Sequence, residues 1–539
     1  MDASSTAPGA RRRFLLAAAC AAGNLPLLAA CAGAPTQARS APDPQAALDP
    51  AGVLDRISWG ATSSDYERLR SMGSAAWISG QLEPDEQAAL TPAVAAQIDA
   101  MTIERTPVHE LVFALEAQRK AAEAIAEDAA KKAAQHDYQF ELNRLAREAA
   151  TRQLLRAVYS PKQLQEQMTW FWCNHFSVHQ AKHNIRAMVG DYERCLRAHA
   201  LGRFSDLLAA SARHPAMLAY LDNAQNAVNH VNENYARELM ELHTLGVDGG
   251  YSQRDVQELA RVLTGFGVNP NDPARAEAPR VRTGYGAQYV RDGLFEFHPN
   301  RHDYGDKVVL GRTIRGAGPQ ELDEVIALLA QHPATARHIC AKLARYFVGG
   351  QAPAGGGRGA DQPDAALVDA MASEFQRSGG HIPSVLRVAF AAPQFGASLH
   401  RNFKDPMHFV VSAVRLAYDD RPIANANPMV NWLARLGEAP FGRATPDGYS
   451  LAEAAWDGPG QLAARFEIAK AIGTGSAGLF RTEGPNPSER PAFPQMANAF
   501  FYESLQGRLA PATREALGQA SSPQEWNLLV LSSPEFMMR

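Results

Sequence analysis

Three histidines, His175, His179 and His183, stand four residues apart in the stretch WFWCNHFSVHQAKH. On a helix this spacing stacks the imidazoles on one face, which is how a helix presents two ligands to a metal ion. His175 follows Met168 and Trp172 on one bulky stripe, so we expect it to face the packed side, either as a core histidine or as part of a site. His179 and His183 lie in a polar stretch, where we expect them to be solvated.

A second group of polar residues lies on one stripe of a helix that begins near Asn232. It consists of Asn234, Glu238 and Glu241. If these side chains face solvent, they are an ordinary polar surface. If they face inward, the carboxylates need a cation, a basic partner or a proton, because an unpaired buried carboxylate is costly. Arg237 flanks the stripe and carries the positive charge that an ion pair needs. The sequence is therefore compatible with a buried ion-pair network and with a functional site.

A third group occupies the stretch FHPNRHDYGDK, which contains His298, His302, Asp303, Asp306 and Lys307. The proline and glycine in this stretch predict an irregular loop, and loops often carry binding chemistry. Imidazole and carboxylate ligands without thiolate suit zinc, iron or manganese. The loop can equally be held together by hydrogen bonds without a metal.

Two hypotheses of different class follow from these groups. In the first, the protein is an enzyme with one His/carboxylate cleft, which binds a divalent metal or works by acid–base chemistry. The expected catalytic residues are His175, Glu238, His302 and Asp303, and the expected metal ligands are His175, Glu238, Glu241, His298 and His302. In the second, the same residues form a buried polar network in a non-enzymatic scaffold.

The elements that must position these residues are mostly helices. Residues 109–159 are rich in Ala, Glu, Lys, Arg and Leu and lack Gly and Pro, which predicts one long helix or two joined end to end. Ser160 and Pro161 begin a further helix that we expect to continue to about Val178. Ser252 and Asp255 form a predicted capping box.

Prolines at 319 and 333 open two more predicted helices, and residues 267–294 and 348–364 are predicted to be irregular. Strand-like runs are few. One is 307–310, for which a small hairpin with 295–297 is the candidate pairing. The prediction is a mainly α, multi-helical globular protein with minor β-hairpin content, large enough to form two lobes.

The N-terminus predicts export. Arg11, Arg12 and Arg13 precede a short apolar run, as in a signal peptide with a twin-arginine-like motif, and Leu28-Ala29-Ala30-Cys31 resembles a lipobox. We therefore expect a signal peptide at 1–30, a lipidated Cys31, a flexible tether at 31–50 and a helical domain at 51–539. This domain would be held at the membrane on the periplasmic side of the cell envelope by its lipid; a plain signal peptide is the alternative.

Composition excludes several classes of function. Cleavage after residue 30 removes three arginines and one aspartate, which moves the formal net charge from −4 to −6, so a nucleic-acid partner is not implied. Cys173, Cys195 and Cys340 are too few and too widely spaced for a disulfide framework. The sequence also lacks Gly-x-Ser-x-Gly, a Walker loop and His-Glu-x-x-His, so the common hydrolase, nucleotide and metalloprotease motifs are missing.

Several segments together resemble one protein family, the domain of unknown function 1800. They are residues 172–178, 214–218, 232–266, 297–307, 332–336 and 446–449. The resemblance spans about residues 50–537 and includes Asn174 and His175, but the family pattern does not require His179 or His183. It implies an exported bacterial protein whose activity is not established. It also implies a partner, since members are often encoded beside a sulfatase-like protein of the domain of unknown function 1501 family.

Overall fold

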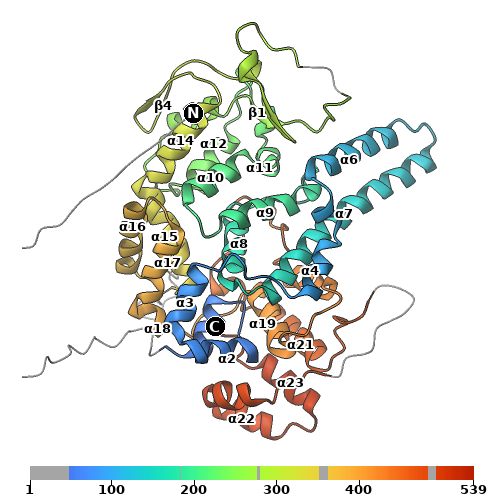
Figure 1. The fold of residues 1–539 in the computed structure, drawn as a ribbon, viewed down its shortest axis with the longest axis vertical. Helices are drawn as coiled ribbons and strands as arrows, with labels where there is room; N and C mark the ends of the chain where they lie inside the picture. The colour runs from blue at the N-terminus through green and yellow to red at the C-terminus, as the bar shows by residue number, and fades with distance from the viewer. Residues whose placement is uncertain (1–47, 183, 276–278, 351–361, 483–492) are drawn as a thin grey trace, which may run out of the picture. The chain divides into compact units, whose positions relative to one another are not determined.

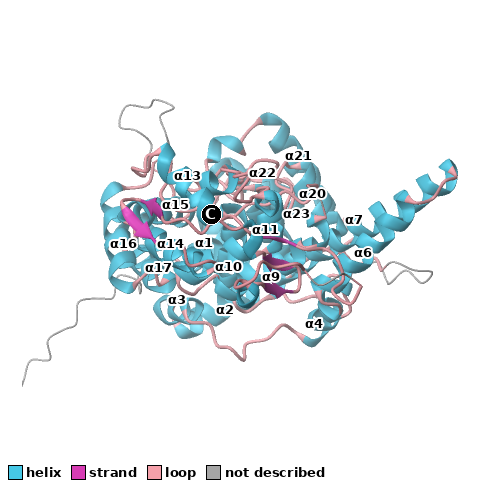
Figure 2. Ribbon diagram, turned by 90° about the horizontal axis from the view of Figure 1, so that it is seen from above, coloured by secondary structure: helices cyan, strands magenta, loops and turns pink. Residues whose placement is uncertain are grey.

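The structure, a computed structural model, describes residues 48–182, 184–275, 279–350, 362–482 and 493–539. Helices dominate these residues and two small sheets complete them (Figure 2), so the mainly α prediction is confirmed. The signal peptide, Cys31, His183 and nearly all of the expected tether lie outside the described residues. None of the helices in the described ranges combines the length and apolar character needed to cross a bilayer.

The helices up to residue 262 are α1 (Pro50–Ile57), α2 (Ser63–Met72), α3 (Ser74–Leu82), α4 (Pro92–Asp99), α5 (Thr102–Arg105), α6 (Val108–Glu123), α7 (Asp128–Tyr159), α8 (Gln163–His175), α9 (Val189–His199), α10 (Phe204–Arg213), α11 (Pro215–Tyr220), α12 (Asn234–Glu241) and α13 (Gln253–Val262). The later helices are α14 (Gln320–Gln331), α15 (Pro333–Phe347), α16 (Ala365–Ser378), α17 (Ile382–Ala391), α18 (Pro393–Ser398), α19 (Pro406–Tyr418), α20 (Asn427–Arg435), α21 (Pro459–Gly473), α22 (Pro511–Gly518) and α23 (Pro523–Ser532).

The helix-rich stretch at 109–159 forms two helices, α6 and α7, which pack against each other as a hairpin (Figure 1). The chain leaves the helical conformation after Ala124, and the side chain of Glu127 then caps α7 by accepting hydrogen bonds from the amides of Ala129 and Ala130. The expectation of an end-to-end arrangement was therefore wrong. A capping carboxylate restarts the helix in a new direction because it satisfies amides that the first turn leaves free.

Helix α8, which ends at His175, is shorter than the sequence predicts. It begins at Gln163, whose side-chain amide donates to the carbonyls of Ala157 and Ser160 and so fixes the corner after α7. It ends before Phe176, where the backbone turns away from helical angles. The Ser252–Asp255 capping box and the proline-led starts of α14 and α15 are confirmed.

The small sheets pair differently from the predicted hairpin. β3 (Phe295–Phe297) lies between β1 (Phe266–Val268) and β2 (Val290–Asp292), and β4 (Lys307–Val309) pairs instead with β5 (Arg312–Ile314). The two residues that join β4 to β5, Leu310 and Gly311, both have positive φ angles of 50° and 75°. A two-residue turn of this kind matches the twist of a hairpin, so β4 pairs with β5, the strand that follows it directly.

The described residues belong to one compact unit with one continuous hydrophobic core, and a division into two lobes is not seen among them. Trp59, Phe171 and Trp172 are among its largest fully buried side chains. Helix α8 therefore runs through the core and carries His175 into it at its C-terminal end.

Candidate functional site

His175 is the last residue of α8 and is 1% exposed. Its ring packs in T-shaped geometry against Trp172 and Phe176, with centroid distances of 5.6 and 4.5 Å. The expectation that His175 faces the packed side is confirmed, and its stripe neighbour Met168 is also fully buried. His179, by contrast, is only half-buried.

Both ring nitrogens of His175 have a partner from a distant segment. Nε2 lies 3.1 Å from the carbonyl oxygen of His243, and Nδ1 lies 2.8 Å from Nζ of Lys342. A carbonyl only accepts, so Nε2 carries the proton and Nδ1 accepts from the lysine. Burial and the charge of Lys342 hold the pKa of His175 well below its usual range, which keeps the ring neutral.

Two further histidines surround this pair. The rings of His243 and His338 have centroids 6.2 and 6.1 Å from that of His175. Burial lowers the pKa of His243 to about 3 and that of His338 to about 4. We call His175, His243, His338 and Lys342 the Lys342 cluster. It combines three neutral imidazoles with one primary amine.

The chain brings the cluster together by two local devices. His338 and Lys342 are four residues apart on α15, so they share one face of that helix. His243 follows α12, where the chain turns at Gly246 with a φ of 84°. A side chain at Gly246 would be strained by this φ, and its Cβ would lie 3.0 Å from Nδ1 of His338. Glycine thus lets the turn approach α15 closely.

Lys342 is the group of the cluster that is best suited to acid–base chemistry. Burial lowers the pKa of its amine to about 8, and the negative charge of Asp447 works against that shift. The residue is partly exposed, unlike His175 and His243, so its amine is held by His175 while the side chain keeps contact with solvent. An amine with a pKa near 8 exchanges protons readily close to neutral pH.

Two carboxylates border the cluster electrostatically. Burial, followed by the charges of Asp447 and Glu238, raises the pKa of Tyr220 to about 12, so the two acids lie near the same phenol. Burial also raises the pKa of Glu238, and the charges of Glu241 and Asp447 add to it. The charge of Asp447 thus acts on the pKa of both Glu238 and Lys342.

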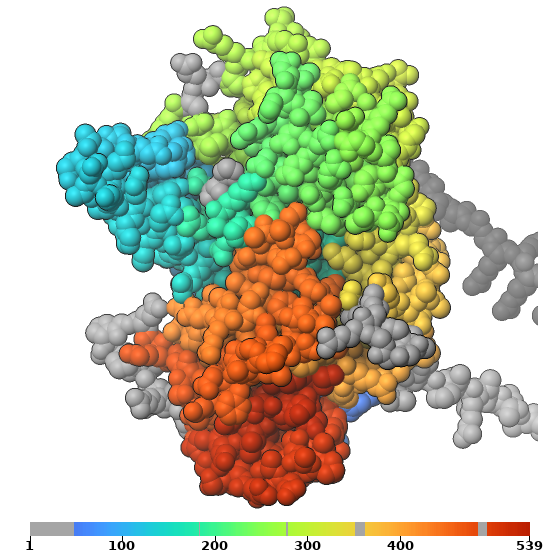
Figure 3. Space-filling model, turned by 180° about the vertical axis from the view of Figure 1, so that it is seen from behind, coloured from blue at the N-terminus to red at the C-terminus, as the bar shows by residue number. Residues whose placement is uncertain are grey.

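The segment that carries Asp447 is fixed against α8 and α11. The Asn174 side chain accepts a hydrogen bond from the Tyr449 amide at 2.5 Å and donates one to the Tyr449 carbonyl at 3.0 Å. The Tyr220 hydroxyl donates to the carbonyl of Ala444 at 2.8 Å. In Figure 3 the orange segment around residues 430–460 accordingly lies against the green segment of residues 200–250.

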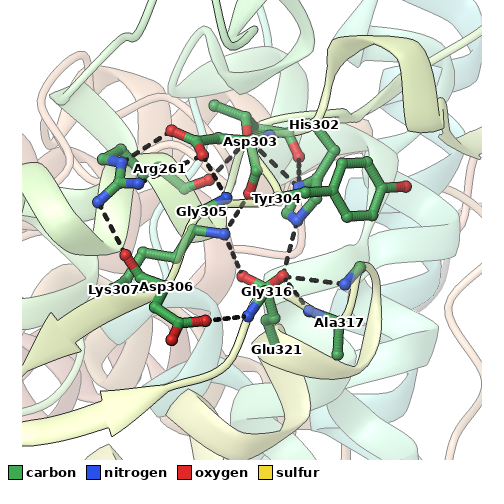
Figure 4. Close-up of polar contacts among 12 residues, drawn as sticks. Arg261, His302, Asp303, Tyr304, Gly305, Asp306, Lys307, Gly316, Ala317 and Glu321 are labelled. Carbon is green, nitrogen blue, oxygen red and sulfur yellow. Dashed lines mark hydrogen bonds and ion pairs between the residues drawn. The ribbon is translucent and has the colours of Figure 1, made fainter.

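The predicted loop forms a separate network. His302 Nε2 and Lys307 Nζ bind the two carboxylate oxygens of Glu321 at 2.9 and 2.5 Å (Figure 4). The carboxylate also accepts hydrogen bonds from the amides of Ala317 and Gly318, just before α14, and His302 Nδ1 donates to the carbonyl of Thr264 at 2.7 Å. All three side chains are buried, and each has at least two protein partners. This arrangement is typical of a structural ion-pair network.

The remaining predicted residues hold local structure. Asp303 pairs with Arg261 at 2.8 Å, and His298 Nδ1 accepts from the Asn300 amide at 3.3 Å. Glu241 accepts a hydrogen bond from Tyr251, and Asn234 is exposed. Arg237 pairs with Glu233, outside the predicted stripe. Of the predicted site residues, the structure places only His175 in the Lys342 cluster.

Several other predictions are also resolved by the described residues. No group of three or more His, Cys, Asp or Glu side chains among them is arranged to hold a metal ion, so the five predicted metal ligands do not meet. Cys173, Cys195 and Cys340 are free thiols. Burial raises the pKa of each of them, to about 11 for Cys195, which disfavours the reactive thiolate.

Sequence reasoning missed His243, His338 and Lys342. A usable signal was present for two of them, because a histidine and a lysine four residues apart in the otherwise apolar HICAKL stretch lie on a buried helix face. His243 is buried whereas Glu238 and Glu241 are half-exposed, so His243 lies on the inner side of this segment. What was not foreseen is that this buried side meets α8 and α15.

The comparisons with known proteins identify the family. Residues 52–538 match the family described as "Protein of unknown function (DUF1800)", so the chain belongs to that family. No curated protein and no solved structure matches the chain.

Proposed function

We propose that this protein is an exported enzyme of the cell envelope in which Lys342 is the acid–base group. The observation that carries the proposal is the 2.8 Å contact between Lys342 Nζ and Nδ1 of the buried, neutral His175. An ion pair with a carboxylate would raise the pKa of a lysine. Because Lys342 is paired with a neutral imidazole, no such ion pair opposes the lowering of its pKa by burial. Its lowered pKa then lets it accept or donate a proton near neutral pH.

His175 would act in this enzyme as a positioning residue. Its Nδ1 lone pair directs one amine hydrogen, while the bond from Nε2 to the His243 carbonyl fixes the ring. Glu238 and Asp447 supply negative charge at the edge of the cluster. That charge favours a substrate that presents hydroxyl or amino groups over one that is anionic.

Export and lipid anchoring form part of the proposal. They are supported by the Arg11-Arg12 pair and by the Leu28-Ala29-Ala30-Cys31 sequence, which suits cleavage before Cys31 and its acylation. The enzyme would then work on the periplasmic side of the envelope. Its metal requirement and its sulfatase-like partner stay predictions.

Competitive acetylation of the intact protein, analysed by peptide mass spectrometry across pH, tests the amine. Lys342 should react with a midpoint near pH 8 in the folded protein, and with a midpoint near the usual lysine pKa of about 10.4 once the protein is unfolded. His175→Phe should lower the Lys342 midpoint of the folded protein further, because it removes the acceptor that favours the charged amine. The same Lys342 midpoint in the folded and the unfolded protein would contradict the proposal.

Complementation of a deletion strain separates the enzyme from a scaffold or maturation partner of a sulfatase-like protein. Lys342→Met should fold yet fail to complement, whereas the matched variant Lys470→Met should complement. Glu238→Gln should fold normally, because the Glu238 side chain is half-exposed and has no ion-pair partner among the described residues. A folded Lys342→Met variant that complements fully would favour the scaffold.

A further inference from the structure

Helix α6 and the segment that follows β1 enclose an open groove of about 800 Å³, which we call the α6 groove. One wall is the face of α6 that carries His109, Phe113 and Lys120, and the other belongs to segment 270–275. This volume falls in the range of roughly 300–1,000 Å³ that is typical of small-molecule sites. The groove is therefore large enough to hold a ligand.

Direct contacts hold the two walls together. Lys120 Nζ donates a hydrogen bond to Asn271 Oδ1 at 2.9 Å. Arg291 of β2 donates to the Asn271 carbonyl, and its guanidinium group lies over the Phe113 ring, 5.8 Å from the ring centre. The groove is thus formed before a ligand arrives, which lowers the cost of ordering its side chains on binding.

The main chain of the groove has few hydrogen bonds left for a ligand. From Leu111 onwards the amides of α6 donate within the helix. In the opposite wall two residues are prolines, which have no amide hydrogen, and the amides of Asn271, Ala274 and Arg275 already donate to oxygens within residues 269–272. A peptide strand that adds to a wall needs free main-chain groups, so the ligand must be recognised through side chains.

The charged side chains of the groove largely neutralise one another. Asp272 pairs with Arg275 at 3.5 Å, and Lys120 pairs with Glu116 at 3.5 Å. Glu110 is exposed and has no ion-pair partner among the described residues. A groove with paired charges and one unpaired carboxylate offers hydrogen-bond donors and acceptors but disfavours an anion.

The surface between these polar groups is apolar. Phe113, Ala114 and Ala117 follow one another at helical spacing on α6, and Pro270 and Pro273 lie on the opposite wall. A matching ligand combines apolar C–H surface with groups that both donate and accept hydrogen bonds. Sugar rings have this combination, because each hydroxyl group donates one hydrogen bond and accepts others.

We propose that the α6 groove binds a neutral oligosaccharide. The C–H faces of its sugar rings would pack against Phe113, Ala114 and Ala117, and its hydroxyl groups would pair with Glu110 and Lys120. The α6 groove shares no residue with the Lys342 cluster, so this proposal stands or falls independently of the acid–base function.

Calorimetric titration of the full chain with maltohexaose and cellohexaose, two neutral oligosaccharides of different shape, tests the proposal. At least one of them should bind with a Kd below about 1 mM. Hexagalacturonate, an acidic sugar chain of the same length, should bind at least about tenfold more weakly than the better neutral probe. Failure of both neutral probes to bind in this range, or tighter binding of hexagalacturonate, would overturn the proposal.

A variant that fills the groove tests its location. Ala117→Trp adds a large side chain at an exposed position of the groove, so it should leave the fold intact and weaken binding of the better neutral probe about tenfold or more. Ala121→Trp, at an exposed alanine of the same helix that does not line the groove, is the matched control and should bind as the parent does. Lys342→Met should also keep the parental affinity. Parental affinity in Ala117→Trp would overturn the proposal.

A measurement on the unaltered protein keeps the test decisive if Ala117→Trp does not fold. The better neutral probe should protect Lys120 from acetylation, measured by peptide mass spectrometry, and should leave the acetylation of Lys470 unchanged. Acetylation of Lys120 at the same rate with and without a saturating concentration of this probe would rule the groove out as the binding site.

Discussion

At the scale of single residues, the histidines differ in what their nitrogens contact. His302 has an oxygen at each ring nitrogen, the Thr264 carbonyl at Nδ1 and the Glu321 carboxylate at Nε2. His243 is buried among the rings of Phe176 and Tyr235, and its Nε2 has no hydrogen-bond partner in the described ranges. His302 therefore pairs with a carboxylate, whereas burial keeps the ring of His243 neutral.

The neutral state of His243 has a consequence for stability at acid pH. Its pKa of about 3 in the folded protein lies below the unfolded value of 6.5, so the unfolded chain binds the proton more readily between these values. Stability from this group is complete above pH 6.5 and is lost as the pH falls towards 3. The loss should amount to about 1.4 kcal/mol per pH unit at most.

His243→Phe should therefore make the free energy of unfolding less dependent on pH between 6.5 and 4. At neutral pH the change should cost less than about 1.5 kcal/mol, because phenylalanine fills a similar volume among aromatic rings. Urea unfolding at several pH values measures both effects. His136→Phe, at a side chain that is 79% exposed, is the control and should keep the parental slope. An unchanged slope in His243→Phe would contradict the neutral ring.

At the scale of elements, the first turn of α14 anchors the irregular loop before β4. Glu321 lies in that turn, where free amides and the helix dipole favour a carboxylate. It accepts hydrogen bonds from the amides of Ala317 and Gly318, which precede the helix, and pairs with His302 of the loop and Lys307 of β4. A helix terminus thus replaces the regular hydrogen bonding that a loop lacks.

Glu321→Gln should destabilise the protein by about 3–5 kcal/mol, because it leaves Lys307 and His302 buried without their anion. The double variant Glu321→Gln with Lys307→Met should recover part of that loss. Glu324→Gln is the control. Glu324 lies on the same helix as Glu321 and pairs with the exposed side chain of Arg312, so this change should cost less than about 1 kcal/mol. Denaturant unfolding distinguishes these cases, and a Glu321→Gln loss as small as that of Glu324→Gln would show that the network carries little stability.

At the scale of the whole molecule, the candidate site depends on segments far apart in the chain. α8, the turn after α12, and α15 contribute its four residues, and the contact between His175 and Lys342 spans 167 positions. The cluster therefore exists only when these segments are packed together. The predicted export signal, by contrast, depends only on the sequence of the N-terminal region.

Cys31→Ser should release the protein from the membrane fraction or block its processing, because the thiol is the predicted acylation point. Each buried CH₂ of an acyl chain contributes about 0.8 kcal/mol to membrane binding, so its loss should be evident on fractionation. Cys195→Ser, at a free thiol in the described residues, is the control and should leave fractionation unchanged. Unchanged membrane association of Cys31→Ser would argue for a plain signal peptide.

The sequence by itself determined the features that depend on near neighbours and on composition. Proline at a helix start, the Ser252–Asp255 box and the bulky stripe around His175 act within a few residues, so α14, α15, α13 and the burial of His175 could all be predicted. The family could be recognised for the same reason, because its motifs are short segments.

Only the tertiary structure decided which polar groups meet. The sequence placed His302 and Asp303 with His175, but the loop found nearer partners in Glu321 and Arg261. His175 instead met Lys342, a residue whose helical pattern marks it as buried but does not say against what. Contacts between distant segments are set by the packing of the whole core, which local spacing does not encode.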